Sequence, residues 1–127
     1  MSALTFTLKK DLVQRLNLSP LTPDLLAEKS AKDIAATSLW YGKQQIRADE
    51  AFDITGTDAS HIVFKNSSDK LDYIGSQMKS GSITIEGNAG NYLAFQMRKG
   101  EINLNGNALD FAASGMAGGT LKVNGNV

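Results

Sequence analysis

Short segments in which apolar and polar residues alternate run through the C-terminal half of the chain. Ile83 and Ile85 alternate with polar neighbours, and a Gly-Asn pair follows at 87–88. Alternation with a period of two predicts a short strand with one buried face. Gly-Asn is typical of a turn, because both residues tolerate a left-handed backbone. The same alternation at residues 3–8 predicts a strand near the start of the chain.

This strand-and-turn pattern recurs three times with a spacing of 19 residues. The segments that begin at Gly81, Gly100 and Gly119 align without gaps. The aligned columns hold apolar, glycine, asparagine and methionine residues: Ile83, Ile102 and Leu121; Ile85, Leu104 and Val123; Gly87, Gly106 and Gly125; Asn88, Asn107 and Asn126; Met78, Met97 and Met116. One segment is too small to bury its own apolar face, whereas stacking the segments at the strand spacing of about 4.8 Å would cover it.

A stack of parallel coils, that is, a β-solenoid, accounts for these columns. An antiparallel meander is the alternative, because Gly-Asn also marks hairpins. A meander requires no columns of matching residues, so the solenoid is favoured. Two weaker copies of the strand pattern, at 52–56 and 62–66, lie upstream at irregular spacing. We therefore expect residues 51–127 to form stacked coils.

Residues 1–50 are expected to form a small α/β cap, because the open end of a solenoid would expose its core and its strand edges. The run Thr-Pro-Asp at 22–24 predicts a helix start with a hydroxyl N-cap, proline at the first position and an acid in the first turn. Ser-Ala-Lys-Asp at 30–33 predicts a second capped helix. Residues 12–16 fit either a helical turn or a strand.

The second helix is expected to continue towards Gly42. Ile34, Leu39 and Trp40 would then be its buried contacts, and residues 40–42 its exit. Residues 44–50 are polar and are expected to form a surface connection.

Several stretches resemble the N-terminal half of the C subunit of formylmethanofuran dehydrogenase, and of the gamma subunit of the formyltransferase/hydrolase complex of methylotrophic bacteria. They read LSPLTPDLL at 18–26, LWYG at 39–42, FDITGTDA at 52–59, LDYIG at 71–75 and GNAG at 87–90. The first two are the specific ones. The glycine repeat alone is also similar to the C-terminal domain of the glutamate synthase large subunit. Members of the family are longer, so the resemblance implies further coils beyond this chain.

This resemblance implies a mainly β fold, a right-handed parallel β-helix of 19-residue coils behind the α/β cap. It also implies partner subunits that hold the catalytic sites. In the methylotroph complex a formyl unit passes from a pterin carrier to a furan carrier and is hydrolysed to formate. In the methanogen complex a tungsten- or molybdenum-pterin subunit makes the enzyme a dehydrogenase. The resemblance assigns no catalytic residue to the present chain.

Composition narrows the range of functions. Thirteen Lys and Arg balance thirteen Asp and Glu, which argues against a nucleic acid or an anionic membrane surface as partner. The absence of cysteine excludes disulfides, Cys-ligated zinc, iron–sulfur clusters and a thiol nucleophile. A chain without secretion signal or apolar span is expected in the cytoplasm.

Candidate chemistry is sparse. His61 is the only histidine, and Asp58 and Ser60 lie near it in sequence. Neighbours on a strand point to opposite faces, so Ser60 and His61 are not expected to meet as a triad requires. The acids at 49–53 are expected to lie in a solvated loop. The asparagine column is expected to form an amide ladder, and the methionine column to fill the core. We therefore assign no catalytic, cofactor-binding or metal-binding residue, and regard the column residues as structural.

The sequence thus favours a non-catalytic structural subunit of a formyltransferase/hydrolase-type complex that converts formaldehyde to formate in one-carbon metabolism. One alternative is a stand-alone interaction module that self-associates through an edge strand at 120–124, because an unpaired strand edge is a template for pairing. Another is a small hydrolase that uses His61.

Overall fold

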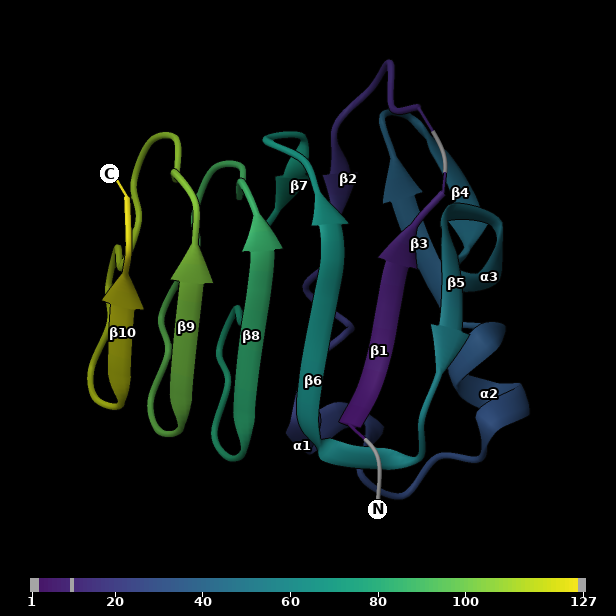
Figure 1. Ribbon diagram of the computed structural model, residues 1–127, viewed down its shortest axis with the longest axis horizontal. Coiled ribbons are helices and arrows are strands. Elements are labelled where there is room, and N and C mark those ends of the chain that lie inside the picture. Colours follow the sequence, from purple (N-terminus) through teal and green to yellow (C-terminus); the bar gives the residue numbers. More distant parts are fainter. Residues whose placement is uncertain (1–2, 10, 126–127) are drawn as a thin grey trace.

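The computed structural model describes residues 3–9 and 11–125, which form ten strands and three short helices (Figure 1). In chain order these are β1 (Ala3–Leu8), β2 (Leu16–Asn17), α1 (Pro23–Leu26), α2 (Ala31–Ala35), β3 (Ser38–Tyr41), β4 (Gln44–Arg47), α3 (Ala48–Ala51), β5 (Phe52–Thr55), β6 (Asp58–Ser67), β7 (Leu71–Asp72), β8 (Ser82–Gly87), β9 (Glu101–Asn105) and β10 (Thr120–Val123).

The larger sheet has six strands in the order β10-β9-β8-β6-β1-β5. Strands β10, β9, β8, β6 and β1 pair in parallel, whereas β5 pairs antiparallel with β1. Ile83 pairs with Ile102, and Ile102 pairs with Leu121. These are the positions that the 19-residue spacing aligns, so their side chains lie in one row on the same face of the sheet.

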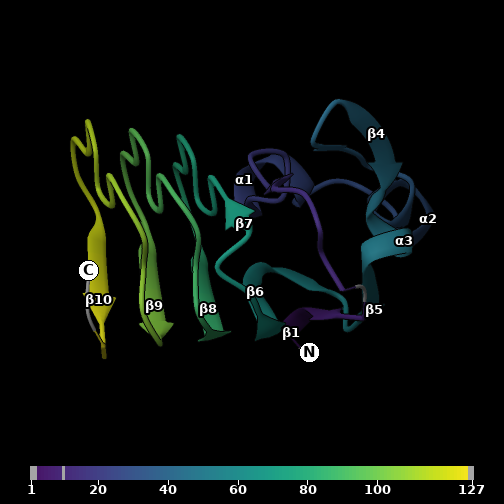
Figure 2. The same cartoon turned by 90° about the horizontal axis from the view of Figure 1, so that it is seen from above.

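A second sheet orders four short strands as β4-β3-β2-β7. Its β2–β7 pair is parallel, and its β2–β3 and β3–β4 pairs are antiparallel. Seen from above, α1 and β7 lie on the opposite side of the molecule from β8, β9 and β10 (Figure 2). Three turn segments, residues 73–77, 92–96 and 111–115, continue this second layer.

The prediction of a right-handed parallel β-helix is wrong. The chain is a mixed α/β protein with two mixed sheets of six and four strands. The N-terminal strand β1 lies between β6 and β5, so residues 52–56 are not a further parallel copy of the repeat but an antiparallel edge strand. The chain between successive strands β8, β9 and β10 consists of turns, and each repeat therefore contributes a single strand.

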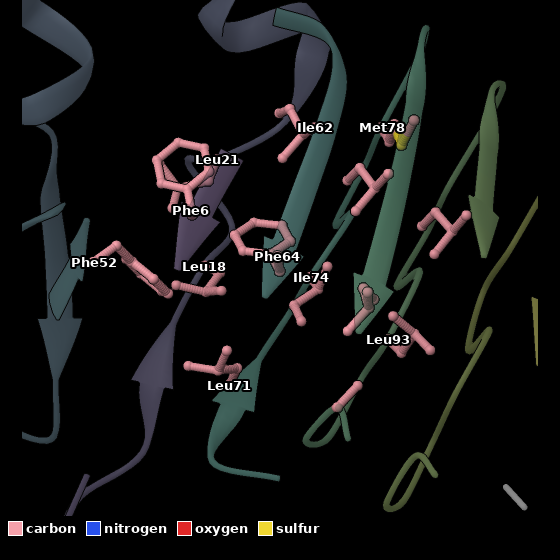
Figure 3. Packing of buried hydrophobic residues seen from close by; sticks show 14 of the residues in the cluster. Phe6, Leu18, Leu21, Phe52, Ile62, Phe64, Leu71, Ile74, Met78 and Leu93 are labelled. Carbon is pink, nitrogen blue, oxygen red and sulfur yellow. The ribbon is translucent and has the colours of Figure 1, made fainter. Parts of the chain in front are cut away.

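The core lies between the two layers, as the close view in Figure 3 shows. Phe6, Phe52 and Phe64 are almost completely buried, and their ring centroids lie 5.4 to 6.0 Å apart. Ile62 and Ile83 extend the apolar row towards β9, because β6 pairs with β8 at these residues. One continuous core therefore joins the N-terminal strand to the repeats.

The glycine column marks a close approach of backbones. A Cβ at Gly106 would overlap the carbonyl oxygen of Gly87, and one at Gly125 would overlap that of Gly106. Only glycine permits this spacing, so the column is a packing requirement of the stacked strands.

The N-terminal region differs from its predicted elements in three places. Residues 38–41 form strand β3 instead of a helix exit, and alternation along this strand leaves Leu39 buried but Trp40 52% exposed. Residues 44–51 form β4 and α3 instead of a surface connection. The hydroxyl of Thr22 makes no capping hydrogen bond to α1, whereas the Ser30 hydroxyl accepts one from the Asp33 N–H at 3.1 Å, as predicted.

Candidate interaction surface

Three aromatic rings are stacked on the outer surface of the turn segments. The rings of Tyr73 and Tyr92 lie 5.0 Å apart with 5° between their planes, and those of Tyr92 and Phe111 lie 5.1 Å apart with 14° between planes. Phe95 packs edge-on against both tyrosines, at 5.7 and 5.3 Å. We call Tyr73, Tyr92 and Phe111 the aromatic ladder.

Each ring of the ladder belongs to a residue with a left-handed backbone, at φ 60° for Tyr73, 59° for Tyr92 and 63° for Phe111. Large residues rarely adopt this conformation. It is held by hydrogen bonds between successive turns: the Tyr73 N–H donates to the Asn91 carbonyl, and the Tyr92 N–H to the Asp110 carbonyl, both at 3.0 Å.

A partly buried ion pair anchors the row of residues that precedes the ladder. Both carboxylate oxygens of Asp72 accept hydrogen bonds from Arg15, at 2.6 and 2.7 Å, and one also accepts the Asn91 N–H at 2.8 Å. Asn91 in turn accepts the Asp110 N–H through its side chain, at 3.1 Å. The hydrogen bond to Asp72, with its charge, raises the pKa of the Arg15 guanidinium. The same row therefore keeps the three turns in register.

An open groove of about 460 Å³ lies beside the first ring of the ladder. It runs between α1 with the preceding loop and the first turn segment, and its lining includes Leu25, Tyr73, Gln77 and Lys79. Leu25 is 53% exposed. The groove and the ladder thus form one continuous surface of aromatic, aliphatic and amide groups.

His61 pairs with the following strand and not with its sequence neighbours. Its Nδ1 lies 2.7 Å from the hydroxyl of Ser82, a residue 21 positions away that the sequence pattern around His61 does not indicate. Ser60 donates its hydroxyl and its N–H to Asp58, at 2.5 and 3.1 Å, and the hydroxyl bond lowers the pKa of that carboxyl. The acid therefore engages Ser60, and the structure does not bring Asp58, Ser60 and His61 together as a relay.

The acids at 49–53 lie in α3 and β5 and not in a loop, and two of them, Asp49 and Asp53, form local ion pairs. Asp49 accepts two hydrogen bonds from Arg47 at 3.0 Å, which lowers its carboxyl pKa, and Asp53 lies 3.4 Å from Lys9. Within residues 3–9 and 11–125 no three His, Asp or Glu side chains gather as metal ligands would.

The asparagine and methionine columns occupy structural positions. Asn88 accepts the Asn107 N–H through its side chain, at 3.0 Å, which joins two consecutive turns. Met78 and Met97 are fully buried, and Met116 is partly buried against the core. Asn126 lies outside the described residues. The aromatic ladder is not among the predicted columns, although its residues share the 19-residue spacing of those columns.

Comparison with known proteins finds no matching protein-family model. The C subunit of molybdenum-containing formylmethanofuran dehydrogenase 1 of Methanosarcina barkeri is 36% identical over 87 residues, which are 65% of this chain and 29% of that protein. The C subunit of the tungsten-containing dehydrogenase 2 of Methanococcus maripaludis is 30% identical over 92 residues, or 71% of this chain and 34% of that protein. The C subunit of the formyltransferase/hydrolase complex Fhc of Methylorubrum extorquens is 28% identical over 86 residues, which are 68% of this chain and 32% of that protein.

A crystal structure agrees with these sequence matches. A chain of the formyltransferase/hydrolase complex FhcABCD from Methylorubrum extorquens, solved with methylofuran, superposes with a TM-score of 0.87 and 29% identity over 95% of this chain. The resemblance to the C subunit of formylmethanofuran dehydrogenase is confirmed. The chain spans 29% to 34% of those three relatives and 46% of the crystallised chain. Among the helices in the described part of the chain, none is long and apolar enough to cross a membrane.

Proposed function

We propose that this chain is a structural, non-catalytic part of a C subunit that assembles with the other subunits of a formyltransferase/hydrolase-type complex in one-carbon metabolism. The observation that carries the proposal is the superposition on a chain of FhcABCD, which includes 95% of the residues at a TM-score of 0.87. At 29% identity such agreement supports a shared assembly role as well as a shared fold.

The use that the protein makes of its polar side chains supports a structural role. The carboxylate of Asp72 neutralises Arg15 and orders the turn at Asn91, and Asn88 orders the turn at Asn107. These polar groups form hydrogen bonds that hold one turn against the next. Reactive groups of enzymes are instead aimed into clefts, next to partners that shift their pKa values.

Assembly is tested with the Methylorubrum extorquens complex, whose other subunits are produced without its C subunit. The chain is co-expressed with them under an affinity tag, and the full-length C subunit serves as the positive control. The expected result is co-elution in size-exclusion chromatography at a defined ratio. If the full-length control assembles and this chain elutes alone, the proposal fails. Self-association of the chain in sedimentation would then favour the stand-alone module.

The non-catalytic role is tested on the assembled complex. The variant His61→Ala is expected to retain the rate of formyl transfer and hydrolysis within a factor of two, and Ser82→Ala is the matched control for the hydrogen bond between the two side chains. A loss of more than ten-fold in His61→Ala, with assembly and Ser82→Ala unaffected, would contradict a purely structural role.

A further inference from the structure

Strand β5 leaves one side of its backbone open, at the end of the six-stranded sheet that lies furthest from β10 (Figure 1). The Lys9 N–H donates to the Ala51 carbonyl at 3.0 Å, where the antiparallel pairing of β5 with β1 begins. In such a pairing every second residue directs its N–H and C=O groups to the partner strand, and the residues between them direct theirs away. Asp53 therefore bonds to β1, whereas Phe52 and Ile54 direct their backbone groups to the open side.

The open side of β5 lacks the usual protection of an edge strand. The Phe52 N–H donates to the Ala48 carbonyl of α3, but the Phe52 carbonyl and both backbone groups of Ile54 bond to no residue in the described part of the chain. Proteins commonly block such edges with proline, lysine or a bulge, and β5 has none of these. Its one acid, Asp53, is paired with Lys9 at 3.4 Å. Three backbone groups are thus open to another extended chain.

An apolar pocket of about 190 Å³ lies at this edge, between α2, β1 and β5. Its lining includes Leu4, Ile34, Ala35 and Ile54. The pocket is smaller than the roughly 300–1,000 Å³ of typical sites for small molecules, and it suits an aliphatic side chain. Residues directly opposite each other on neighbouring strands direct their side chains to the same face of a sheet. A residue that pairs with Ile54 therefore directs its side chain towards the pocket.

We propose, building on the proposed function, that an extended segment of another subunit of the complex pairs with the open side of β5 and inserts an aliphatic side chain into this pocket. In strand addition of this kind the backbone hydrogen bonds supply affinity, and the pocket selects the side chain. A small molecule would leave the backbone groups unpaired. A second copy of the chain would present its own β5, whose Ile54 side chain packs against its own core and so does not fill the pocket.

The test uses the Methylorubrum extorquens subunits prepared without the C subunit and measures their binding to the immobilised chain. Ile54→Pro removes the outward N–H without breaking a hydrogen bond to β1, and Ile54→Ala is its control, because it shortens the same side chain but keeps the N–H. Ala35→Leu fills the pocket. Its control is Ala36→Leu, which changes an exposed neighbour outside the lining. Urea denaturation verifies that each variant is folded, and Ala35→Leu decides if Ile54→Pro is not.

Ile54→Pro and Ala35→Leu are each expected to bind the subunits at least ten-fold more weakly than their controls. Hydrogen–deuterium exchange at the Ile54 amide, followed by mass spectrometry, should be fast in the isolated chain and slow in the complex.

If the unaltered chain binds and either folded variant binds as tightly as its control, the docking edge is refuted while the proposed function stands. If the unaltered chain does not bind, both fail. Slow exchange at Ile54 in the isolated chain would show that the chain covers its own edge, which also refutes the proposal. If Ile54→Pro abolishes only self-association in sedimentation, a second copy is the occupant and the proposed one is wrong.

Discussion

The sequence and the structure predict opposite effects of Thr22→Val on the free energy of unfolding. As a hydroxyl N-cap, Thr22 would stabilise α1, and removing the hydroxyl would lower the free energy of unfolding by about 1 kcal/mol. In the structure the Thr22 side chain is 1% exposed. Its hydroxyl is buried and makes no hydrogen bond with any of the described residues. The structure therefore predicts the opposite result.

The magnitude follows from the burial of the hydroxyl. A buried polar group without a partner costs about 1–3 kcal/mol, and valine has the same shape with a methyl group in place of the hydroxyl, worth about 0.8 kcal/mol when buried. We expect Thr22→Val to raise the free energy of unfolding by about 1–2 kcal/mol. With an m-value of about 2 kcal/mol/M, the urea midpoint should rise by about 0.5–1 M.

Urea denaturation followed by circular dichroism and by Trp40 fluorescence measures the change, and coincident curves establish two-state unfolding. Ser30→Ala is the matched control, because the Ser30 hydroxyl does cap α2; it should lower the free energy of unfolding by about 0.5–1 kcal/mol. A midpoint for Thr22→Val that falls together with that of Ser30→Ala would refute the reasoning.

Three further variants test how the turns are held. Arg15→Met leaves the Asp72 carboxylate without its cation and should lower the free energy of unfolding by about 1–3 kcal/mol, less than for a fully buried pair because the Arg15 side chain is 42% exposed; an unchanged urea midpoint would contradict this. Ala113→Gly relieves a left-handed backbone at φ 61° and should raise the free energy of unfolding by about 0.5–1 kcal/mol, seen as a higher melting temperature. A lower melting temperature would show that the packing lost with the methyl group outweighs the relief of backbone strain. Gly106→Ala places a Cβ against the Gly87 carbonyl and should lower the free energy of unfolding by about 2 kcal/mol or more, measured by thermal melting; an unaffected melt would mean that the strands separate at no cost.

Local patterns predicted the strands of the repeat and their mutual pairing. The alternation at Ile83 and Ile85 fixes which side chains are buried, and the 19-residue spacing fixes which residues pair. The second helix start was also predictable, because the Ser30 cap depends on residues close in sequence. Information of this kind is contained within one segment or in the comparison of similar segments.

The sheet arrangement was not predictable in the same way. Alternation at residues 3–8 predicts a strand but carries no information on its partner, and the pairing of Phe6 with Phe64 and Ile54 joins segments far apart in the sequence. The alternation of apolar and polar residues in β5 likewise does not indicate that this strand pairs antiparallel with β1. For this reason a repeat that is real in sequence led to the wrong fold class.

The left-handed conformation of the turn segments was difficult to predict because these segments contain few glycines. A left-handed backbone usually indicates glycine, yet Tyr73 and Tyr92 adopt it, and their N–H groups bond to the turn that follows. The strain of one turn is thus offset by contacts with the next, which no single turn reveals. The aromatic column was nevertheless readable from its spacing, as the methionine column was.

The candidate surface and the stability of the fold depend on the same contacts. Arg15 comes from the N-terminal region, Asp72 from β7, and the hydrogen bonds that start at Asp72 continue through Asn91 to Asp110. Asp72, Asn91 and Asp110 each directly precede a ring of the ladder, so the N-terminal region helps to orient the backbone that carries the rings. A flat surface can bind a partner tightly only if its groups are held in place before binding, because ordering them on contact would consume binding free energy. The partly buried ion pair, which by itself need add little to stability, therefore gains its importance from the exposed rings that it keeps in register.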